Sequence, residues 1–122
     1  MGLKPGIYHL DTRDNSLDLI AFGKYGNKMS KIAQGQTFVA NASIVVLITG
    51  VFKRYMFRYR QSRAYRDILT TAAELAQQII IYSTYFDVKT FETPALKDTE
   101  LQKMLGLEDW EEESLYLLAL GR

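Results

Sequence analysis

Positive charges and aromatic rings alternate in residues 53–66. Six cations fall within these fourteen residues: Lys53, Arg54, Arg58, Arg60, Arg63 and Arg66. Guanidinium groups bind carboxylates and phosphates through paired hydrogen bonds, so the segment is a candidate anion site or contact for an acidic partner. A solvated face with snorkelling side chains is the plainer interpretation. Nucleic acid is the least favoured partner, because the net charge of the whole chain is only +1.

Other catalytic or metal-binding patterns do not stand out in the sequence. The chain has one histidine, His9, and no cysteine, so no Ser/His/Asp triad or zinc site is expected, and no metal is predicted. His9 falls in an expected strand, where a structural or surface role is usual. The carboxylates of residues 108–113 are interpreted as a solvated turn. The glycines match neither GxGxxG nor GxxxxGK[ST], which excludes these two phosphate-binding fingerprints.

The composition is typical of one globular domain covering residues 1–122. Hydrophobic residues make up 48% of the chain and charged residues 24%, which is an ordinary balance. The lack of cysteine fits a reducing compartment, so we expect a cytoplasmic protein. The first residues lack an apolar stretch, so we expect no signal peptide. Glu74 and several Thr, Gln and Ser residues interrupt the apolar run at 68–86, which argues against a membrane span.

Residues 62–86 have the spacing of a single long helix, with Ser62 as its N-cap. Two neighbouring faces of this helix are apolar. The first holds Ile68, Ala72, Leu75, Ile79, Tyr82 and Phe86, and the second holds Leu69, Ala73, Ala76, Ile80 and Ser83. A helix that is apolar this far round must be covered on more than one side, and a chain of 122 residues offers little cover. We therefore expect a homodimer or a complementing subunit.

The remaining segments predict an α+β fold with a mixed sheet packed against helices. Residues 43–49 and 114–120 are continuously apolar, so we expect them side by side with the long helix across them. Residues 43–49 have the pattern of a central strand buried on both faces. The shorter elements are a hairpin of residues 7–10 and 16–22, helices at 28–34, 51–59 and 98–105, and a strand at 88–91. Gly106 is expected to end the helix at 98–105.

Three long runs together resemble a known family. They are GLKPGIYHLDTRDNSLDLI, FVANASIVVLITGVFKRYMFRYRQSRAYRDILTTAAELAQQ and LKDTELQKMLGLEDWEEESLYLLALGR. The first motifs are a GlyLeu-x-ProGly-hydrophobic-TyrHis hairpin at residues 2–9 and an apolar strand with Phe and Lys-Arg at residues 44–54. An Arg-Ala-Tyr-Arg segment that ends at residue 66 follows, and then Leu-Ala-Gln at residues 75–77. The last motifs are a Leu-Gly-Leu and a closing Gly-Arg. In this order they resemble the C-terminal half of SagB-type dehydrogenases, within the FMN-dependent nitroreductase-like superfamily. The resemblance covers nearly all of this chain but only half of a typical member.

The resemblance implies a partial nitroreductase-like domain that pairs as a homodimer, with FMN at the interface. It implies two-electron hydride transfer, and several members act on modified peptides, so a peptide substrate is expected. The catalytic Lys-Tyr pair of the family matches Arg58 and Tyr59. The cofactor-binding positions of the family match Arg63, Gln77, Thr93, Pro94, Ala95 and Arg122. The resemblance implies that residues 93–95 pass near the flavin ring and that Arg122 lies near the phosphate.

The sequence also departs from the family. The arginine-rich segment that holds the FMN phosphate in members has no counterpart here, so we expect weak or absent FMN binding by this chain alone. Ala73 and Glu74 stand where members often have Gly-His. Arg58 replaces the catalytic lysine, and arginine does not deprotonate near neutral pH. Three hypotheses follow: an oxidoreductase domain that needs a missing half or subunit, a non-catalytic dimerisation or peptide-binding module, and an unrelated small binding protein.

Overall fold

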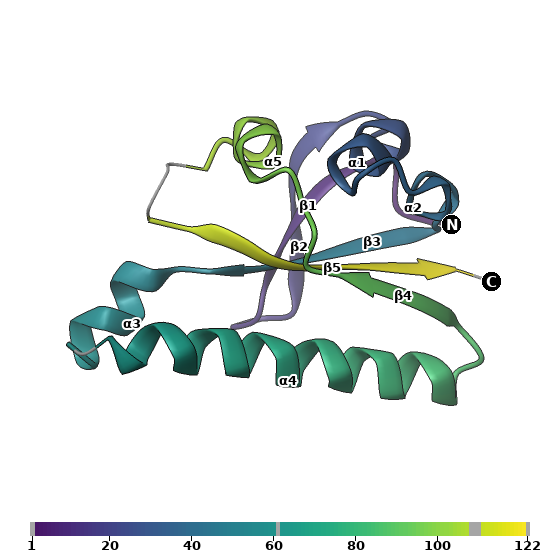
Figure 1. The fold of residues 1–122 in the computed structure, drawn as a ribbon. Helices are drawn as coiled ribbons and strands as arrows, with labels where there is room; N and C mark the ends of the chain where they lie inside the picture. Colours follow the sequence, from purple (N-terminus) through teal and green to yellow (C-terminus); the bar gives the residue numbers. More distant parts are fainter. Residues whose placement is uncertain (1, 61, 108–110, 122) are drawn as a thin grey trace.

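The computed structural model describes residues 2–60, 62–107 and 111–121 and has helices on both faces of a small sheet (Figure 1). The sheet has the order β3-β5-β4, and both strand pairs are antiparallel. Its strands are β3 (Ile44–Gly50), β4 (Lys89–Thr93) and β5 (Glu113–Gly121). A separate two-stranded antiparallel hairpin consists of β1 (Gly6–Asp11) and β2 (Ser16–Phe22).

The helices divide between the two faces of the sheet. Three short helices lie on one face, the long helix crosses the other face, and one further short helix joins β3 to the long helix (Figure 1). The three are α1 (Gly26–Ile32), α2 (Thr37–Asn41) and α5 (Asp98–Leu105); the long helix is α4 (Arg63–Tyr85), and the joining helix is α3 (Phe52–Arg58).

Strand β5 supplies side chains to a separate core on each side of the sheet. Leu117 and Leu118 are fully buried neighbours, and successive side chains of a strand point to opposite faces. Leu117 packs in the cluster that includes Ile32 and Leu101 from the short helices. Leu118 packs in the second cluster, with Ala76 of α4. The central strand therefore ties both helical layers to one sheet.

Helix α4 packs Ala72 and Ala76, with Ile79 and Ile80 partly buried beside them, in the core on its side of the sheet, and it leaves other large side chains exposed to solvent. Its buried residues are Ala64, Ala72 and Ala76, and alanine lets the helix backbone approach its neighbours closely. The large apolar side chains that stay exposed on α4 are Tyr65, Leu69, Leu75, Ile81, Tyr82 and Tyr85. The expectation that this chain cannot cover both apolar faces of the long helix is therefore confirmed for the described residues.

The structure confirms the α+β fold and the pairing of residues 43–49 with residues 114–120, but it corrects the position of the first strand. β3 is an edge strand of the described sheet, and β5 is the central one. An apolar run indicates that helices cover both faces of a strand. It does not indicate how many neighbouring strands that strand has. Ile44, at the start of β3, is 59% exposed.

The helices differ in detail from the prediction. The first helix begins at Gly26 rather than at residue 28, and α2 was not expected. Ser62 occupies the N-cap position of α4, but its side chain makes no capping hydrogen bond. Gly106 does end α5 in the left-handed conformation, with φ of 69°, as predicted.

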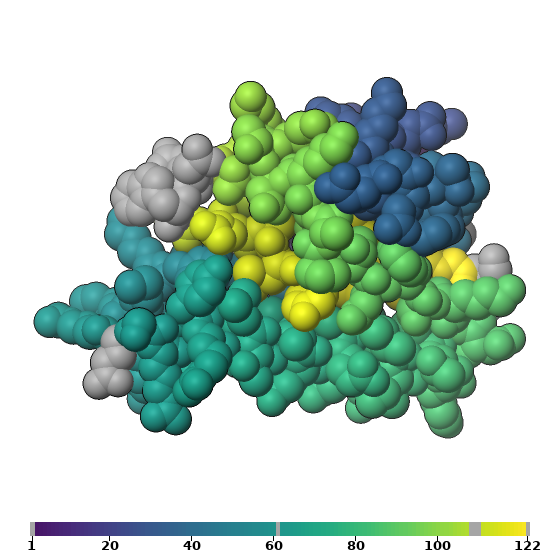
Figure 2. Space-filling model, viewed as in Figure 1, coloured from purple at the N-terminus to yellow at the C-terminus, as the bar shows by residue number. Residues whose placement is uncertain are grey.

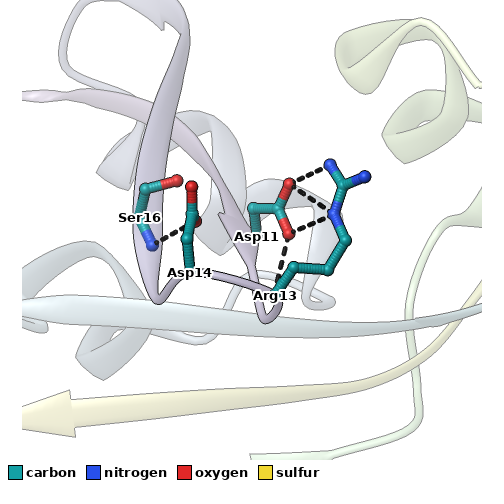
Figure 3. A network of polar contacts seen from close by, with 4 residues as sticks. All are labelled: Asp11, Arg13, Asp14 and Ser16. Atoms are coloured by element: carbon teal, nitrogen blue, oxygen red, sulfur yellow. Dashed lines mark hydrogen bonds and ion pairs between the residues drawn. The ribbon is translucent and has the colours of Figure 1, made fainter.

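Charged side chains order the turn of the hairpin (Figure 3). The Asp11 carboxylate accepts a hydrogen bond from the Arg13 backbone N–H at 3.0 Å and forms an ion pair with the Arg13 guanidinium. The Asp14 carboxylate accepts a hydrogen bond from the Ser16 backbone N–H at 3.1 Å. The bonds from Arg13 lower the pKa of Asp11, and the bonds from Ser16 lower the pKa of Asp14. Each carboxylate is therefore favoured in its charged form.

Replacing Gly26 should loosen the contact between α1 and α2. A Cβ atom on Gly26 would lie 2.6 Å from the backbone oxygen of Ala40. Alanine favours helix by about 1 kcal/mol over glycine, but a forced backbone shift costs about 1–3 kcal/mol. We therefore expect Gly26→Ala to lower the free energy of unfolding by about 1–2 kcal/mol in urea denaturation. Gly2→Ala is the control, since nothing lies within 4 Å of its added Cβ; equal stability of both variants would contradict the close approach.

Removing the Arg13 side chain should raise the pKa of Asp11 toward its ordinary value, because the guanidinium is the largest cause of its lowering. The pKa of Asp11 is lowered in the folded hairpin. The ion pair therefore stabilises the folded hairpin at pH values above the ordinary carboxyl pKa, and this stabilisation is lost as the pH falls through the lowered pKa. We expect NMR titration of Arg13→Ala to show a higher Asp11 midpoint. Asp14 should keep its lowered midpoint, because Ser16 is its partner. An unchanged Asp11 midpoint would refute this account.

Candidate functional site

Three of the predicted site residues line one hollow of about 580 Å³ at the N-terminal end of α4. They are both members of the predicted catalytic pair, Arg58 and Tyr59, and the predicted cofactor-binding residue Arg63. The other lining residues are Arg60, Ala64 and Asp67. These residues come from the end of α3, the residues that follow it and the first turns of α4, and the two helices meet at one end of the molecule (Figure 1). We call it the arginine pocket.

Aromatic packing holds α3 against α4. Phe52 is buried, and its ring stacks on the ring of Tyr65 with centroids 5.2 Å apart. Within α3 and the residue after it, Tyr55 contacts Tyr59 at 5.2 Å, and the Arg58 guanidinium lies 5.7 Å from the centre of the Tyr59 ring. These contacts place Arg58 and Tyr59 beside the start of α4.

Hydrogen bonds to the segment before β5 hold the other side of α3. The Lys53 ammonium donates to the Glu111 carboxylate at 2.8 Å, and the Thr49 hydroxyl donates to the Glu112 carboxylate at 2.5 Å. Gly50 lies between them, and a Cβ there would meet Leu115 Cδ1 at 2.9 Å. The chain leaves the sheet at Gly50. The hydrogen bonds of Thr49 and Lys53 and the close Leu115 side chain set its direction there.

The arginine pocket has an excess of positive charge. Within residues 2–60, 62–107 and 111–121, the side chains of Arg54, Arg58, Arg60, Arg63 and Arg66 form no ion pair. Asp67 is the one acidic residue in the pocket lining. The positive end of the α4 dipole adds to this field. Such a pocket can bind a carboxylate or a phosphate, whereas Arg58 cannot remove a proton near neutral pH.

The other predicted cofactor-binding residues do not line the arginine pocket. Gln77 is exposed on α4, about 20 Å beyond Arg63 at roughly 1.5 Å of rise per residue. Thr93 ends β4 and is buried, and its hydroxyl oxygen accepts a hydrogen bond from the Ala95 backbone N–H at 3.0 Å. Pro94 and Ala95 are exposed. Arg122, the remaining predicted contact, lies outside the described residues.

A second hollow, of about 590 Å³, was not predicted as a site and lies toward the C-terminal end of α4. It is formed between the helix and the ends of β3 and β5, and we call it the apolar groove. Its lining is Ser43, Ile44, Leu75, Gln78, Ile79, Tyr82, Ser83, Phe86, Val88, Leu120 and Gly121. The first apolar face of the long helix contains four of these residues, so the sequence did carry a signal for this surface.

Two kinds of site are not found among the described residues. No helix within residues 2–60, 62–107 and 111–121 has the length and apolar character needed to cross a bilayer. The same residues contain no group of three or more His, Asp or Glu side chains placed to hold a metal ion. The arginine pocket and the apolar groove are the two hollows described above.

Two known proteins are similar to this chain in sequence. No family model matches the chain. It is 34% identical over 119 residues to the trifolitoxin operon protein TfxC of Rhizobium leguminosarum bv. trifolii, covering 98% of this chain and 33% of TfxC. It is 25% identical over 122 residues to MJ1384 of Methanocaldococcus jannaschii, whose name describes it as a nitroreductase, covering all of this chain and 60% of that one. The chain thus spans between a third and two thirds of these relatives.

Solved structures confirm the fold. A protein of Anabaena variabilis named as a nitroreductase matches 99% of this chain with a TM-score of 0.88 at 23% identity, over 24% of its own length. The E. coli microcin synthetase complex McbBCD, with truncated pro-MccB17 bound, contains a chain that matches 94% of this one with a TM-score of 0.83 at 17% identity, over 43% of its length. The fold is therefore nitroreductase-like, as the resemblance inferred from the sequence implied.

Removal of the Phe52 ring should destabilise the chain and detach α3 from α4. Phe52 is 7% exposed, and truncation of a buried phenylalanine costs about 3–5 kcal/mol. We expect Phe52→Ala to lower the free energy of unfolding by about 3 kcal/mol in chemical denaturation. Phe57→Ala makes the same change in the same helix at a residue that is 81% exposed, and should cost about 0.5 kcal/mol or less. If both variants lose the same stability, Phe52 does not anchor α3.

Proposed function

We propose that residues 1–122 act as one domain of an FMN-dependent oxidoreductase of the SagB type, completed by a missing half or by another subunit. The observation that carries this proposal is the match of 99% of the chain to a nitroreductase-like structure at a TM-score of 0.88, over only 24% of that protein's length. The shares of TfxC and MJ1384 that the chain spans, 33% and 60%, support the same conclusion. Residues 1–122 thus correspond to only part of the length of each of these relatives.

The arginine pocket fits the phosphate of FMN. A phosphate dianion requires arginine, lysine or a helix N-terminus, and the pocket has Arg58, Arg60 and Arg63 beside the start of α4. Bound FMN would supply a flavin ring that accepts and returns a hydride. In this proposal Arg58, Arg60 and Arg63 contact the phosphate, and the Tyr59 hydroxyl donates to the bound cofactor.

The remaining proposed contacts need a second polypeptide to complete the site. Gln77 and the residues 93–95 lie away from the arginine pocket in this chain. A homodimer or a complementing subunit would bring further groups to the pocket, and it would cover exposed side chains of α4 such as Tyr82 and Tyr85, the latter 81% exposed. This arrangement is consistent with weak flavin binding by the chain alone.

We further propose a peptide substrate and a cytoplasmic location. The microcin synthetase complex that this chain resembles in fold holds a truncated peptide precursor, pro-MccB17. The absence of cysteine supports a reducing compartment.

One observation favours a non-catalytic alternative. Arg58 occupies the position of a lysine in family members, and its guanidinium stays protonated near neutral pH. A chain that has lost proton transfer at this position could keep the fold as a dimerisation or peptide-binding module. The alternative and the enzymatic proposal differ in whether flavin binds once the missing part is supplied, so the absorbance spectrum of the completed complex separates them.

The proposal predicts that this chain gains flavin only when its missing part is supplied. Mixed with FMN alone, the chain should show little bound-flavin absorbance, because the pocket supplies only part of the contacts. Addition of the segment of MJ1384 that has no counterpart here, in trans or as a fusion, should give a yellow complex that oxidises NADH or NADPH. Arg58→Ala combined with Arg63→Ala should abolish the colour of that complex. A complex that is folded by circular dichroism but stays colourless and inert would reject the enzymatic function in favour of the alternative.

A further inference from the structure

The carboxylate of Asp67 lies in the arginine pocket without a partner. Asp67 lines the pocket together with Arg58, Arg60 and Arg63, and it is partly buried at the end of the molecule where α3 and the start of α4 project (Figure 2). Within the described residues its carboxylate forms no ion pair and accepts no hydrogen bond. Arg63 lies four residues before it on α4, and an ion pair at this spacing is weaker when the cation comes first along the helix. The acid and the guanidinium groups of the lining therefore remain open to a ligand.

An acid in this position weakens the binding of a simple anion. Its charge repels a phosphate or a carboxylate that the three arginines attract. A site discriminates between ligands when one of its groups favours one ligand and opposes another. A carboxylate accepts strong hydrogen bonds from hydroxyl and ammonium groups. The pocket therefore matches a ligand that carries both an anionic group and a hydrogen-bond donor.

The charge balance distinguishes a hydroxyl donor from an ammonium donor. The lining holds three arginines and one aspartate, which leaves two positive charges. The whole end of the molecule gives the same balance among the described residues, because Lys53 and the five arginines of residues 54–66 are opposed by Asp67 and the three glutamates of residues 111–113. A phosphate monoester with a charge of about −1.5 to −2 neutralises this balance when its organic part is uncharged. A zwitterion such as an amino acid would leave the two positive charges in place.

We propose that the arginine pocket binds a phosphate monoester whose organic part carries hydroxyl groups, and that Asp67 selects this ligand by accepting hydrogen bonds from the hydroxyls. This role of Asp67 rests on the proposed function, in which the same arginines contact the phosphate of FMN. The ribityl chain of FMN carries hydroxyls beside its phosphate, so the cofactor belongs to this class of ligand. Hydrogen bonds from a hydroxyl to a carboxylate are roughly twice as strong as neutral ones, and they offset the repulsion between Asp67 and the phosphate.

The test compares three probes on the full chain: inorganic phosphate, pentyl phosphate and ribitol 5-phosphate, each titrated by NMR at physiological salt. We expect ribitol 5-phosphate to bind with a Kd on the order of 1 mM, roughly tenfold more tightly than pentyl phosphate, which has the same chain length without hydroxyls. Asp67→Ala should weaken the binding of ribitol 5-phosphate several-fold and strengthen that of inorganic phosphate about two- to threefold. These changes have opposite signs, whereas partial unfolding of the variant would weaken the binding of both probes.

Two control variants separate a local contact from a general effect of charge. Glu74→Ala removes the same charge from an exposed position of α4 outside the pocket lining, about 10 Å further along the helix, and should bind all three probes like the unmodified chain. Arg58→Ala combined with Arg63→Ala should abolish the binding of all three probes. The Thr71 hydroxyl donates to the backbone oxygen of Asp67, so this hydrogen bond is kept in Asp67→Ala. Circular dichroism checks that each variant is folded.

Equal affinity for ribitol 5-phosphate and pentyl phosphate would overturn the role of Asp67. So would a change of the same sign for both probes in Asp67→Ala, or identical changes in Glu74→Ala. Tighter binding of phosphoethanolamine than of ribitol 5-phosphate would also overturn it, since the carboxylate would then select an ammonium group. None of these results affects the proposed function as long as the double arginine variant loses phosphate. If no probe binds the unmodified chain, or if the double arginine variant binds as well as that chain, the phosphate site of the proposed function fails too.

Discussion

Pairing of β5 on both edges is the constraint on which the rest of the structure depends. β3 and β4 attach to it, and its neighbouring residues Leu117 and Leu118 are buried in opposite cores. Each helical layer therefore gains its hydrophobic stabilisation through the same strand. Displacement of β5 would disturb the short helices, the long helix and the start of α3 together. A sheet of three strands has little redundancy, since each outer strand has a single hydrogen-bonded neighbour.

The long helix divides the functional surfaces between its two ends. Its N-terminal turns meet α3 and form a polar, positively charged pocket, while its C-terminal turns border an apolar groove. Between the two ends, Ala72 and Ala76 pack in the core cluster that joins the helix to the sheet. One rigid element thus keeps an anion-binding surface and an apolar surface at opposite ends. Whatever polypeptide covers the exposed face of α4 is positioned relative to both.

Sequence reasoning succeeded where the determining interactions are local or depend on side-chain period. The long helix, the pairing of the two apolar runs and the left-handed Gly106 follow from spacing and residue type alone. Arg58, Tyr59 and Arg63 meet because they lie within a few residues of one helix junction. The edge position of β3 could not be read, because an apolar run records covered faces and not neighbouring strands. Gln77 and Thr93 were placed by family resemblance, and no local pattern measures their distance from Arg63.

The edge of β3 that has no partner strand in the described sheet affects how much of the chain can accumulate in a cell. An unpaired strand edge next to exposed apolar residues such as Ile44 is a template for further strand pairing. Copies made in excess of whatever covers that edge are exposed to aggregation, chaperone capture and proteolysis. If the partner proposed above covers that edge, the amount of this protein that accumulates would follow the supply of that partner rather than its own rate of synthesis. Balanced production of the two polypeptides would be a requirement imposed by the sheet itself.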